Sequence, residues 1–196
     1  MIRLALLRHG PTEWNRAGRI QGRSDIPLDA DARADLRRLA LPAPWDRAAL
    51  WSSPLSRARE TAELVAGRAP QVSDALTEMN WGDWEGQKGA DLLADPATDY
   101  RHIEDWGWEY RPPGGESPAD LRARLLPWCA GLTGDTVAVC HIGIMRVLLA
   151  HAHGWNFDGP VPFRVKRARL FVLTVDGETL TPDAEPIRLI TREGVS

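Results

Sequence analysis

The chain has 196 residues, of which 43% are hydrophobic and 26% charged, with a formal net charge of −3. A chain of this length suits one globular domain that buries roughly 70% of its unfolded surface. The small negative charge gives no reason to expect nucleic acid or an anionic membrane as a partner, so an anion site must come from a local cluster of arginines.

No stretch approaches the roughly 18 apolar residues that span a membrane, and the apolar run at the start is too short for the core of a secretory signal. The two cysteines, Cys129 and Cys140, have neither metal-ligand nor disulfide-framework spacing. We therefore expect a cytoplasmic protein without a membrane partner, in which Cys140 is a buried, reduced thiol.

The first predicted element is a buried strand, because residues 2–7 are apolar apart from Arg3. Arg8, His9 and Gly10 follow directly at its end. Ligands of open α/β sheets bind beyond the carboxyl ends of the strands. There the arginine suits an anion, the histidine suits a nucleophile or base, and the glycine lets the backbone approach a ligand. These residues alone fit a capped strand end with a solvated Arg-His pair equally well.

The remaining elements are predicted from apolar runs, caps and breakers. In the first half of the chain they are a loop at 14–26, a helix capped by Asp29 and ending at Leu41, a strand at 48–51, a helix capped by Ser53 and ending at Gly67, and a short strand at 71–73. An irregular segment at 83–116 follows, and then a helix opened by Ser117-Pro118, a buried strand at 136–140 and a helix at 143–150. The last two elements are strands at 170–175 and 187–191, which flank a turn at Asp176-Gly177.

Strands that alternate with helices predict an α/β fold, a three-layer sandwich whose mostly parallel central sheet is flanked by helices. Segment 83–116 is long and irregular, which is typical of a lid or a binding loop. Its tryptophans, Trp84, Trp106 and Trp108, favour core or lid packing over a platform for substrate. We expect a single domain over 1–196 that carries this lid-like segment.

Five polar residues are expected to meet at one edge of the sheet. Arg8 and His9 end the first strand, His141 ends the strand at 136–140, and Arg57 and Glu78 follow two other predicted strands. This set suits phosphoryl transfer, in which catalysis is mostly positioning and stabilisation of charge. A histidine can attack phosphorus directly, and a carboxylic acid can protonate the leaving alkoxide. No acidic cluster has metal-ligand spacing, so we expect neither metal nor cofactor.

These residues lie in motifs that resemble the signature of the histidine phosphatase superfamily, the phosphoglycerate mutase-like proteins. The motifs are LRHGPTEWN at 7–15, GRIQG at 18–22, DIPL at 25–28, SSPLSRARETA at 52–62, Glu78 with GDWEG at 82–86, PGGES at 113–117 and VCH at 139–141. They cover most of the chain to about residue 150 in the family's order and spacing. The resemblance is specific, and it points to the small phosphatase branch.

The resemblance implies a role for each matching position. It implies that His9 is the nucleophile that forms a phosphohistidine and that Glu78 is the proton donor to the leaving group. It implies a phosphate clamp made of Arg8, Arg57 and His141, assisted by Asn15. Gln21 and Gly22 fall where the family lines the substrate entrance. Two positions depart from the family. Ile142 and Ala32 stand where glycine is usual, and these changes bear on substrate and packing rather than on chemistry.

We therefore expect a phosphatase that hydrolyses a small phosphorylated metabolite through a phosphohistidine on His9. One alternative is phosphoryl transfer of the phosphoglycerate mutase type, without a metal. A mutase shields its phosphoenzyme from water, and such members are generally longer, which favours hydrolysis here. The other alternative is a non-catalytic module that binds a phosphorylated ligand, but His9, Arg57 and His141 are all present. The natural substrate, and whether the chain forms a homo-oligomer, stay open.

Overall fold

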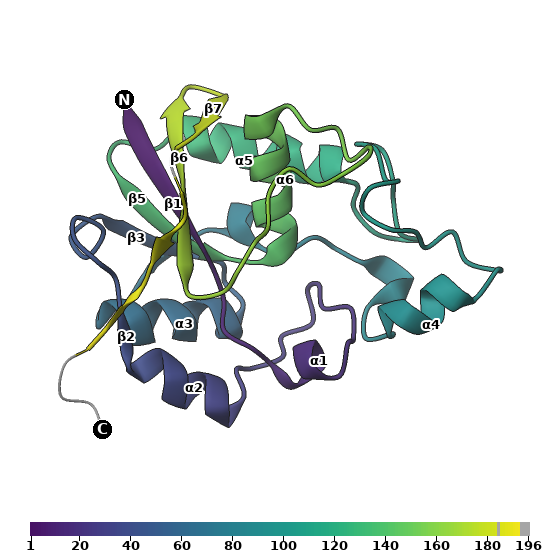
Figure 1. The fold of residues 1–196 in the computed structure, drawn as a ribbon, viewed down its shortest axis with the longest axis horizontal. Helices are drawn as coiled ribbons and strands as arrows, with labels where there is room; N and C mark the ends of the chain where they lie inside the picture. The colour runs from purple at the N-terminus through teal and green to yellow at the C-terminus, as the bar shows by residue number, and fades with distance from the viewer. Residues whose placement is uncertain (184, 193–196) are drawn as a thin grey trace.

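A mixed β-sheet forms the centre of the computed structural model, which describes residues 1–183 and 185–192 (Figure 1). Its strand order is β4-β3-β5-β1-β6-β7, and β8 also pairs with β6. The strands are β1 (Ile2–Arg8), β3 (Ala49–Ser52), β4 (Gln71–Val72), β5 (Thr136–Cys140), β6 (Arg169–Asp176), β7 (Thr179–Pro182) and β8 (Ile187–Arg188). Strands β1, β3, β4 and β5 are parallel, whereas β6 runs antiparallel to β1, β7 and β8.

Six α-helices complete the described part of the chain, with 3₁₀ turns at Asp74–Leu76 and Gly82–Trp84. The helices are α1 (Glu13–Arg16), α2 (Ala30–Arg37), α3 (Ser56–Ala66), α4 (Gly89–Ala94), α5 (Pro118–Ala130) and α6 (Ile142–His153). None of the helices in these residues is long and apolar enough to cross a membrane. A separate two-stranded sheet pairs β2 (Leu39–Ala40) with β9 (Ile190–Thr191).

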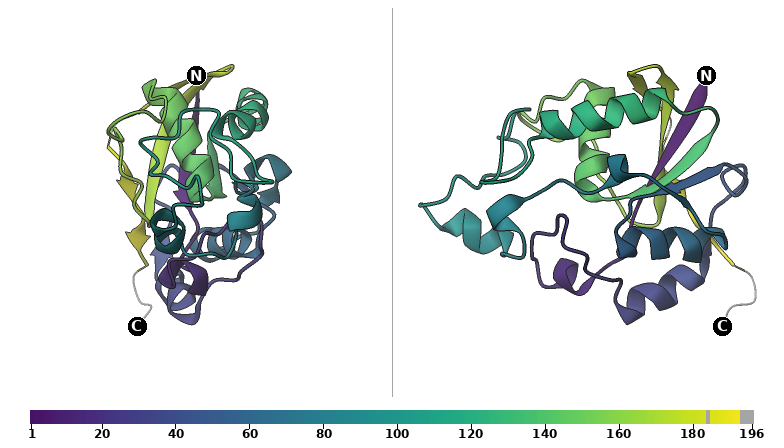
Figure 2. Two further views of the ribbon diagram at one scale, coloured as in Figure 1. Left: turned by 90° about the vertical axis from the view of Figure 1, so that its right-hand side faces the viewer. Right: turned by 180° about the vertical axis from the view of Figure 1, so that it is seen from behind.

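Helices cover both faces of the sheet, as Figures 1 and 2 show. Successive side chains of a strand point to opposite faces. In β1, Leu4 and Leu6 pack into the core that includes residues of α5 and α6, while Ala5 and Leu7 pack into the core that includes residues of α2 and α3. The predicted three-layer α/β sandwich is confirmed. The parallel centre matters for function, because it brings the carboxyl ends of β1, β3 and β5 to one edge.

Several predicted caps are present. Asp29 caps α2, Gly67 ends α3 with a φ of +68°, and Ser117 forms a capping box with Asp120 at the start of α5. The predicted cap at Ser53 is wrong, because α3 begins at Ser56 after an N-cap residue, Leu55, that has no side-chain hydrogen bond. The hydroxyl of Ser53 lies 2.7 Å from Nε2 of His141 instead.

Other differences arise where pairing with a distant strand decides the conformation. The helix predicted to end at Leu41 ends at Arg37, because residues 39–40 pair with β9. The strand predicted at 187–191 is split between β8 and β9, which belong to two sheets. Asp176-Gly177 leads into β7, a hairpin partner of β6 that was not predicted. The predicted loop at 14–26 begins inside the short helix α1.

Segment 83–116 contains α4 and is otherwise irregular, and it lies at one end of the molecule (Figure 1). Its chain is fixed by aromatic packing. The ring of Trp106 stacks on Tyr110 and Phe157 at centroid distances of 5.3 and 6.0 Å, and Trp84 packs edge-on against Tyr100. Trp84 and Trp106 are buried. These tryptophans pack as expected, and Trp106 also lines the cavity that contains His9.

Candidate active site

The two histidines of the candidate site follow neighbouring parallel strands. Arg8 at the end of β1 is in register with Cys140 at the end of β5, so His9 and His141 are the next residues on each strand. The backbone N–H of His9 donates to the carbonyl of Cys140 at 3.0 Å. Both side chains are buried, and their ring centroids lie 5.1 Å apart. The parallel pairing thus brings together residues that are far apart in the sequence.

The protonation state of His9 is set by its neighbours. Its Nδ1 lies 2.6 Å from the carbonyl oxygen of Gly10. A carbonyl only accepts hydrogen bonds, so Nδ1 carries the proton and Nε2 keeps its lone pair. Burial, together with the positive charges of Arg57 and Arg8, holds the pKa of His9 well below its usual value. The ring is therefore neutral, which is the state that a nucleophile requires.

Among the residues that the structure describes, no carboxylate is hydrogen-bonded or ion-paired to the cations Arg8 and Arg57. Arg57 donates to the carbonyls of Gly22 at 2.6 Å and Ser24 at 2.8 Å, whereas the Nε atoms of Arg8 and Arg57 are buried without a hydrogen-bond partner. Burial lowers the pKa of Arg8 to about 10 and also lowers that of Arg57. A buried cation is costly unless an anion pairs with it. The arrangement therefore suits an anionic ligand.

His141 adds another buried nitrogen atom without a hydrogen-bond partner. Its Nε2 is bonded to the Ser53 hydroxyl, while its Nδ1 is buried without a partner. Burial, with His9 and Arg57 nearby, lowers the pKa of His141 well below its usual value. Unsatisfied buried polar atoms are rare in folded proteins. Their concentration around His9 indicates a site whose hydrogen bonds are completed by a ligand.

Glu78 contributes the carboxylate of the site, and only 1% of it is exposed. Its Oε1 accepts from the N–H of Met79 at 2.8 Å, and its Oε2 accepts from the N–H of Gly143 at 3.0 Å. Burial raises the pKa of Glu78 from its usual value, although these two N–H donors and the charges of Arg57 and Arg8 partly oppose that shift. A carboxyl with a raised pKa can deliver a proton near neutral pH.

Gly143 leaves room for this carboxyl group. A Cβ at this position would clash with Oε1 of Glu78 and crowd its Cδ at 3.2 Å. The preceding residue, Ile142, lines the cavity, so this departure from the family pattern lies next to the place where a ligand would bind.

Asn15 and Gln21 each present an amide to the same cavity. Oδ1 of Asn15 accepts from the N–H of Thr12 at 3.3 Å, and Oε1 of Gln21 accepts from the Thr12 hydroxyl at 3.1 Å. Nε2 of Gln21 is buried without a partner. Both amides therefore have their oxygens engaged, and their NH₂ groups are left to donate to a ligand.

The cavity has a volume of about 460 Å³. Its lining comprises Arg8, His9, Asn15, Arg19, Ile20, Gln21, Glu78, Trp81, Tyr100, Arg101, His102, Ile103, Glu104, Trp106, Ile142 and Arg146. Segment 83–116 thus supplies much of the wall that faces His9. Arg57, His141 and Gly22 are not part of this lining. Gly22 accepts from Arg57, and a Cβ there would meet the carbonyl of Met79 at 2.7 Å, so its backbone is closely packed, and its contact with a substrate stays a prediction.

Arg167 also belongs to the site, although no sequence motif indicated it. Its Nη2 donates to Oδ1 of Asn15 at 2.9 Å, and its Nε donates to the carbonyl of His9 at 3.3 Å. It comes from the last part of the chain, where no motif was recognised. Its position depends on the antiparallel pairing of β6 with β1, which brings this part of the chain beside His9.

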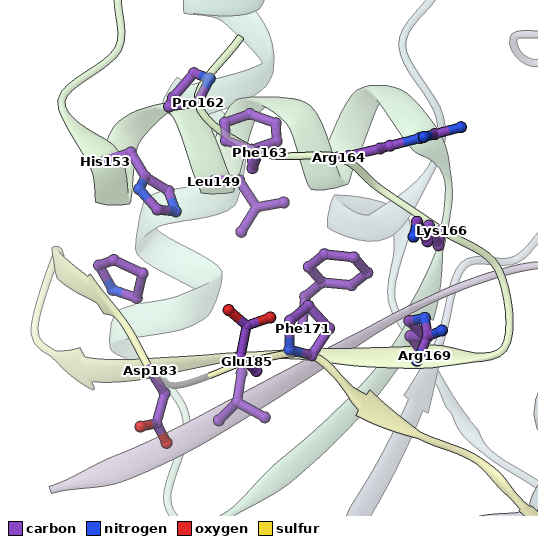
Figure 3. A pocket seen from close by; sticks show the side chains of 13 residues that line it. Leu149, His153, Pro162, Phe163, Arg164, Lys166, Arg169, Phe171, Asp183 and Glu185 are labelled. Carbon is purple, nitrogen blue, oxygen red and sulfur yellow. The ribbon is translucent and has the colours of Figure 1, made fainter.

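A larger hollow of about 820 Å³ lies elsewhere and shares no lining residue with the cavity at His9. Figure 3 shows apolar side chains in its lining, among them Leu149, Phe163 and Phe171, with Arg164 and Lys166 on one side. Its lining includes His153, Arg164, Arg169, Asp183 and Glu185, but His153 is exposed, unlike the buried His9. In the part of the chain that the structure describes, no group of three or more His, Cys, Asp or Glu residues is arranged to hold a metal ion.

Comparison with known proteins agrees with this geometry. A glucosyl-3-phosphoglycerate phosphatase of Mycolicibacterium vanbaalenii is 32% identical over 173 residues, which are 80% of this chain and 76% of that protein. The adenosylcobalamin/α-ribazole phosphatase of Salmonella typhimurium is 35% identical over 174 residues, 80% of this chain and 85% of that protein. The crystal structure of a phosphoglycerate mutase from Thermus thermophilus superposes with a TM-score of 0.70 at 33% identity and covers 100% of both chains.

The sequence profile of the histidine phosphatase superfamily (branch 1) matches residues 4–184. That match includes each candidate site residue, from Arg8 to Arg167. With relatives above 30% identity over most of its length, the chain belongs to the histidine phosphatase superfamily, branch 1.

Proposed function

We propose that this protein is a phosphatase that hydrolyses a phosphate monoester of a small metabolite through a phosphohistidine on His9. The observation that carries the proposal is a neutral histidine whose Nδ1 is held by Gly10, surrounded by buried donors that have no partner. Relatives that are named phosphatases support the same reaction class.

The first step transfers the phosphoryl group to the protein. Nε2 of His9 attacks phosphorus, and the bond between phosphorus and the ester oxygen breaks. The leaving alkoxide takes a proton from the carboxyl group of Glu78. Arg8, Arg57 and His141 donate to the non-bridging oxygens, where charge is concentrated in the transition state. The hydrogen bond from Nδ1 to Gly10 stabilises the positive charge that develops on the ring.

The second step returns the enzyme to its starting state. The Glu78 carboxylate accepts a proton from water, and the water oxygen attacks phosphorus as the bond to Nε2 breaks. Inorganic phosphate leaves, and His9 is neutral again. No metal is needed in either step, because arginine side chains neutralise the phosphate charge.

A phosphoglycerate mutase activity is the second candidate, because a relative with that name matches over the whole length of both chains. The short length of this chain therefore does not argue against a mutase. The two activities share the first step and differ in whether water or a second substrate hydroxyl accepts the phosphoryl group.

The test follows the fate of the phosphoryl group. Purified protein is incubated with a panel of phosphorylated metabolites, with and without unphosphorylated acceptors, and products are resolved by ³¹P NMR. We expect release of inorganic phosphate, an acid-labile phosphoenzyme in rapidly quenched samples, and loss of both in His9→Ala. Phosphate that reappears mainly on an acceptor would identify a mutase. Unchanged turnover by folded His9→Ala would rule out the phosphohistidine mechanism.

A further inference from the structure

We propose that Arg167 is a positioning residue of this site, which orients the Asn15 amide toward the phosphate and fixes a positive charge behind the nucleophile. The inference rests on the proposed function, because it concerns the same cavity. Neither the sequence motifs nor the names of the relatives assign Arg167 a role.

The hydrogen bonds of Asn15 determine which end of its amide faces the cavity. Its Oδ1 accepts from two donors, the N–H of Thr12 at 3.3 Å and Nη2 of Arg167 at 2.9 Å. Only the oxygen of an amide can accept from both, so the NH₂ group is the end left for a ligand. Asn15 lines the cavity beside His9. If the amide were flipped, its oxygen would face phosphate oxygens and repel them.

Arg167 reaches this place because β6 pairs antiparallel with β1. Leu170 is opposite Leu7 in that ladder, so the residues just before Leu170 lie beside the residues just after Leu7. Ala168 adopts a φ of +54°, a left-handed conformation that is rare for a residue with a Cβ. Strained backbone of this kind persists where the surrounding structure holds it, and it is concentrated at functional sites. Here it accompanies the hydrogen bond from Nε of Arg167 to the His9 carbonyl at 3.3 Å.

The positive charge of Arg167 adds to those of Arg8 and Arg57 around His9. Arg8, Arg57 and Arg167 all act on His9, and each of these positive charges lowers its pKa. Arg167 likewise lowers the pKa of Arg8, and its own pKa is lowered by burial. Other titratable groups near His9 are His141, whose pKa is lowered by burial, the buried Glu78 and, in the lining of the same cavity, Arg19, Tyr100, Arg101, His102, Glu104 and Arg146. Repulsion among the three arginines is reduced when a phosphate dianion binds in the cavity at His9.

The test compares Arg167→Gln and Arg167→Lys with a control, Arg169→Gln, which alters an arginine two residues away that lines the larger hollow. Arg167→Gln removes both the positive charge and the guanidinium group that makes the two hydrogen bonds. We expect kcat/KM for 4-nitrophenyl phosphate to fall about tenfold, mainly through KM, and the acid limb of its pH profile to move to higher pH. The limb moves in that direction because His9 loses a neighbouring positive charge and gains a proton more easily.

Arg167→Lys separates the two effects and also carries the test if the Gln variant fails to fold. Lysine keeps the charge but cannot form both hydrogen bonds, so KM should rise while the acid limb stays in place. Arg169→Gln should change neither quantity. A folded Arg167→Gln protein with wild-type KM and an unmoved acid limb would overturn the inference.

A double-mutant cycle tests whether Arg167 acts through Asn15. Asn15→Ala should raise KM, and adding Arg167→Gln to it should raise KM little further, because the amide is already gone. If the increases in KM of the two single variants multiply in full in the double variant, the two residues act independently, which would contradict the positioning role.

Binding of inorganic phosphate separates failure of this inference from failure of the proposed function. In a His9→Ala background, calorimetry should show weaker phosphate binding when Arg167→Gln is added. That result can be obtained even if the wild-type protein turns over no ester. Equal phosphate affinity with and without Arg167→Gln would reject the positioning role alone.

Discussion

At the scale of single residues, the neutral state of His9 predicts how the reaction responds to acid. Ordinary histidine loses its nucleophilicity below a pH of about 6.5. In this protein burial and neighbouring arginines lower the pKa of His9, so the ring stays unprotonated in more acidic solution. We expect the rate of phosphoenzyme formation from 4-nitrophenyl phosphate to be unchanged between pH of about 7.5 and about 6. A fall that follows a pKa near the ordinary histidine value in rapid-quench measurements would contradict the assignment.

Glu78 predicts a difference between substrate types. A nitrophenolate leaves without a proton, whereas an alkoxide of high pKa requires one. Glu78→Gln should therefore slow alkyl phosphates by about 10²–10⁴ and aryl phosphates far less. For alkyl esters, the wild-type kcat/KM should fall as pH rises through the raised pKa of Glu78, because the acid is then ionised. Equal loss on both substrate types would point to electrostatics or altered folding, and Glu85 or Glu116 would then be tested as the acid.

Substitution of Gly143 should lower activity, as substitution of a charged residue of the site does. A methyl group at Gly143 would displace the Glu78 carboxyl and lengthen the hydrogen bond from the Gly143 N–H. We expect Gly143→Ala to imitate Glu78→Gln, with a loss of about tenfold or more on alkyl esters and a smaller loss on 4-nitrophenyl phosphate. Ala152→Gly, in the last turn of the same helix, controls for a general change in α6. Wild-type turnover of alkyl esters by Gly143→Ala would show that Glu78 is not held as described.

At the scale of elements, the capping box of α5 should account for a measurable part of stability. The Ser117 hydroxyl accepts from the N–H of Asp120 at 3.1 Å, and the Asp120 carboxylate accepts from the N–H of Ser117 at 2.9 Å. Ser117→Ala should lower the free energy of unfolding by about 1 kcal/mol in urea titrations. Ser73→Ala is the matched control, because Ser73 precedes a 3₁₀ turn without a side-chain cap. Equal effects of the two changes would mean that the box does not stabilise the helix.

Locally encoded elements could be predicted from the sequence. Strands β1 and β5 are apolar along most of their length, and α2, α5 and the end of α3 carry caps whose chemistry is local. The strand at 39–40 and the division of 187–191 between two sheets could not be predicted, because they depend on pairing between segments that are distant in the sequence. The same limit applied to the site. Arg8, Asn15 and Glu78 lie in motifs, but Arg167 reaches His9 only through the β1–β6 ladder.

At the scale of the whole molecule, the positive charge of the site is supplied from three separate regions of the chain. Arg8 ends β1, Arg57 lies in the first turn of α3, and Arg167 precedes β6, all around His9. Because these guanidiniums are fixed by the fold, we expect phosphate release to be unaffected by excess EDTA and not increased by magnesium or zinc. Phosphate release measured in chelator checks this. Activity that is lost in EDTA and restored by a divalent ion would contradict it.

The aromatic wall of the cavity has an optical consequence. Trp81 and Trp106 both line the cavity, and their rings meet edge to face with centroids 5.5 Å apart. Indole emission responds to nearby charge and to water, so an oxyanion that settles beside His9 alters the environment of these two fluorophores. We therefore expect titration with vanadate or phosphate to change the intrinsic fluorescence of the protein, and Trp81→Phe to diminish that change.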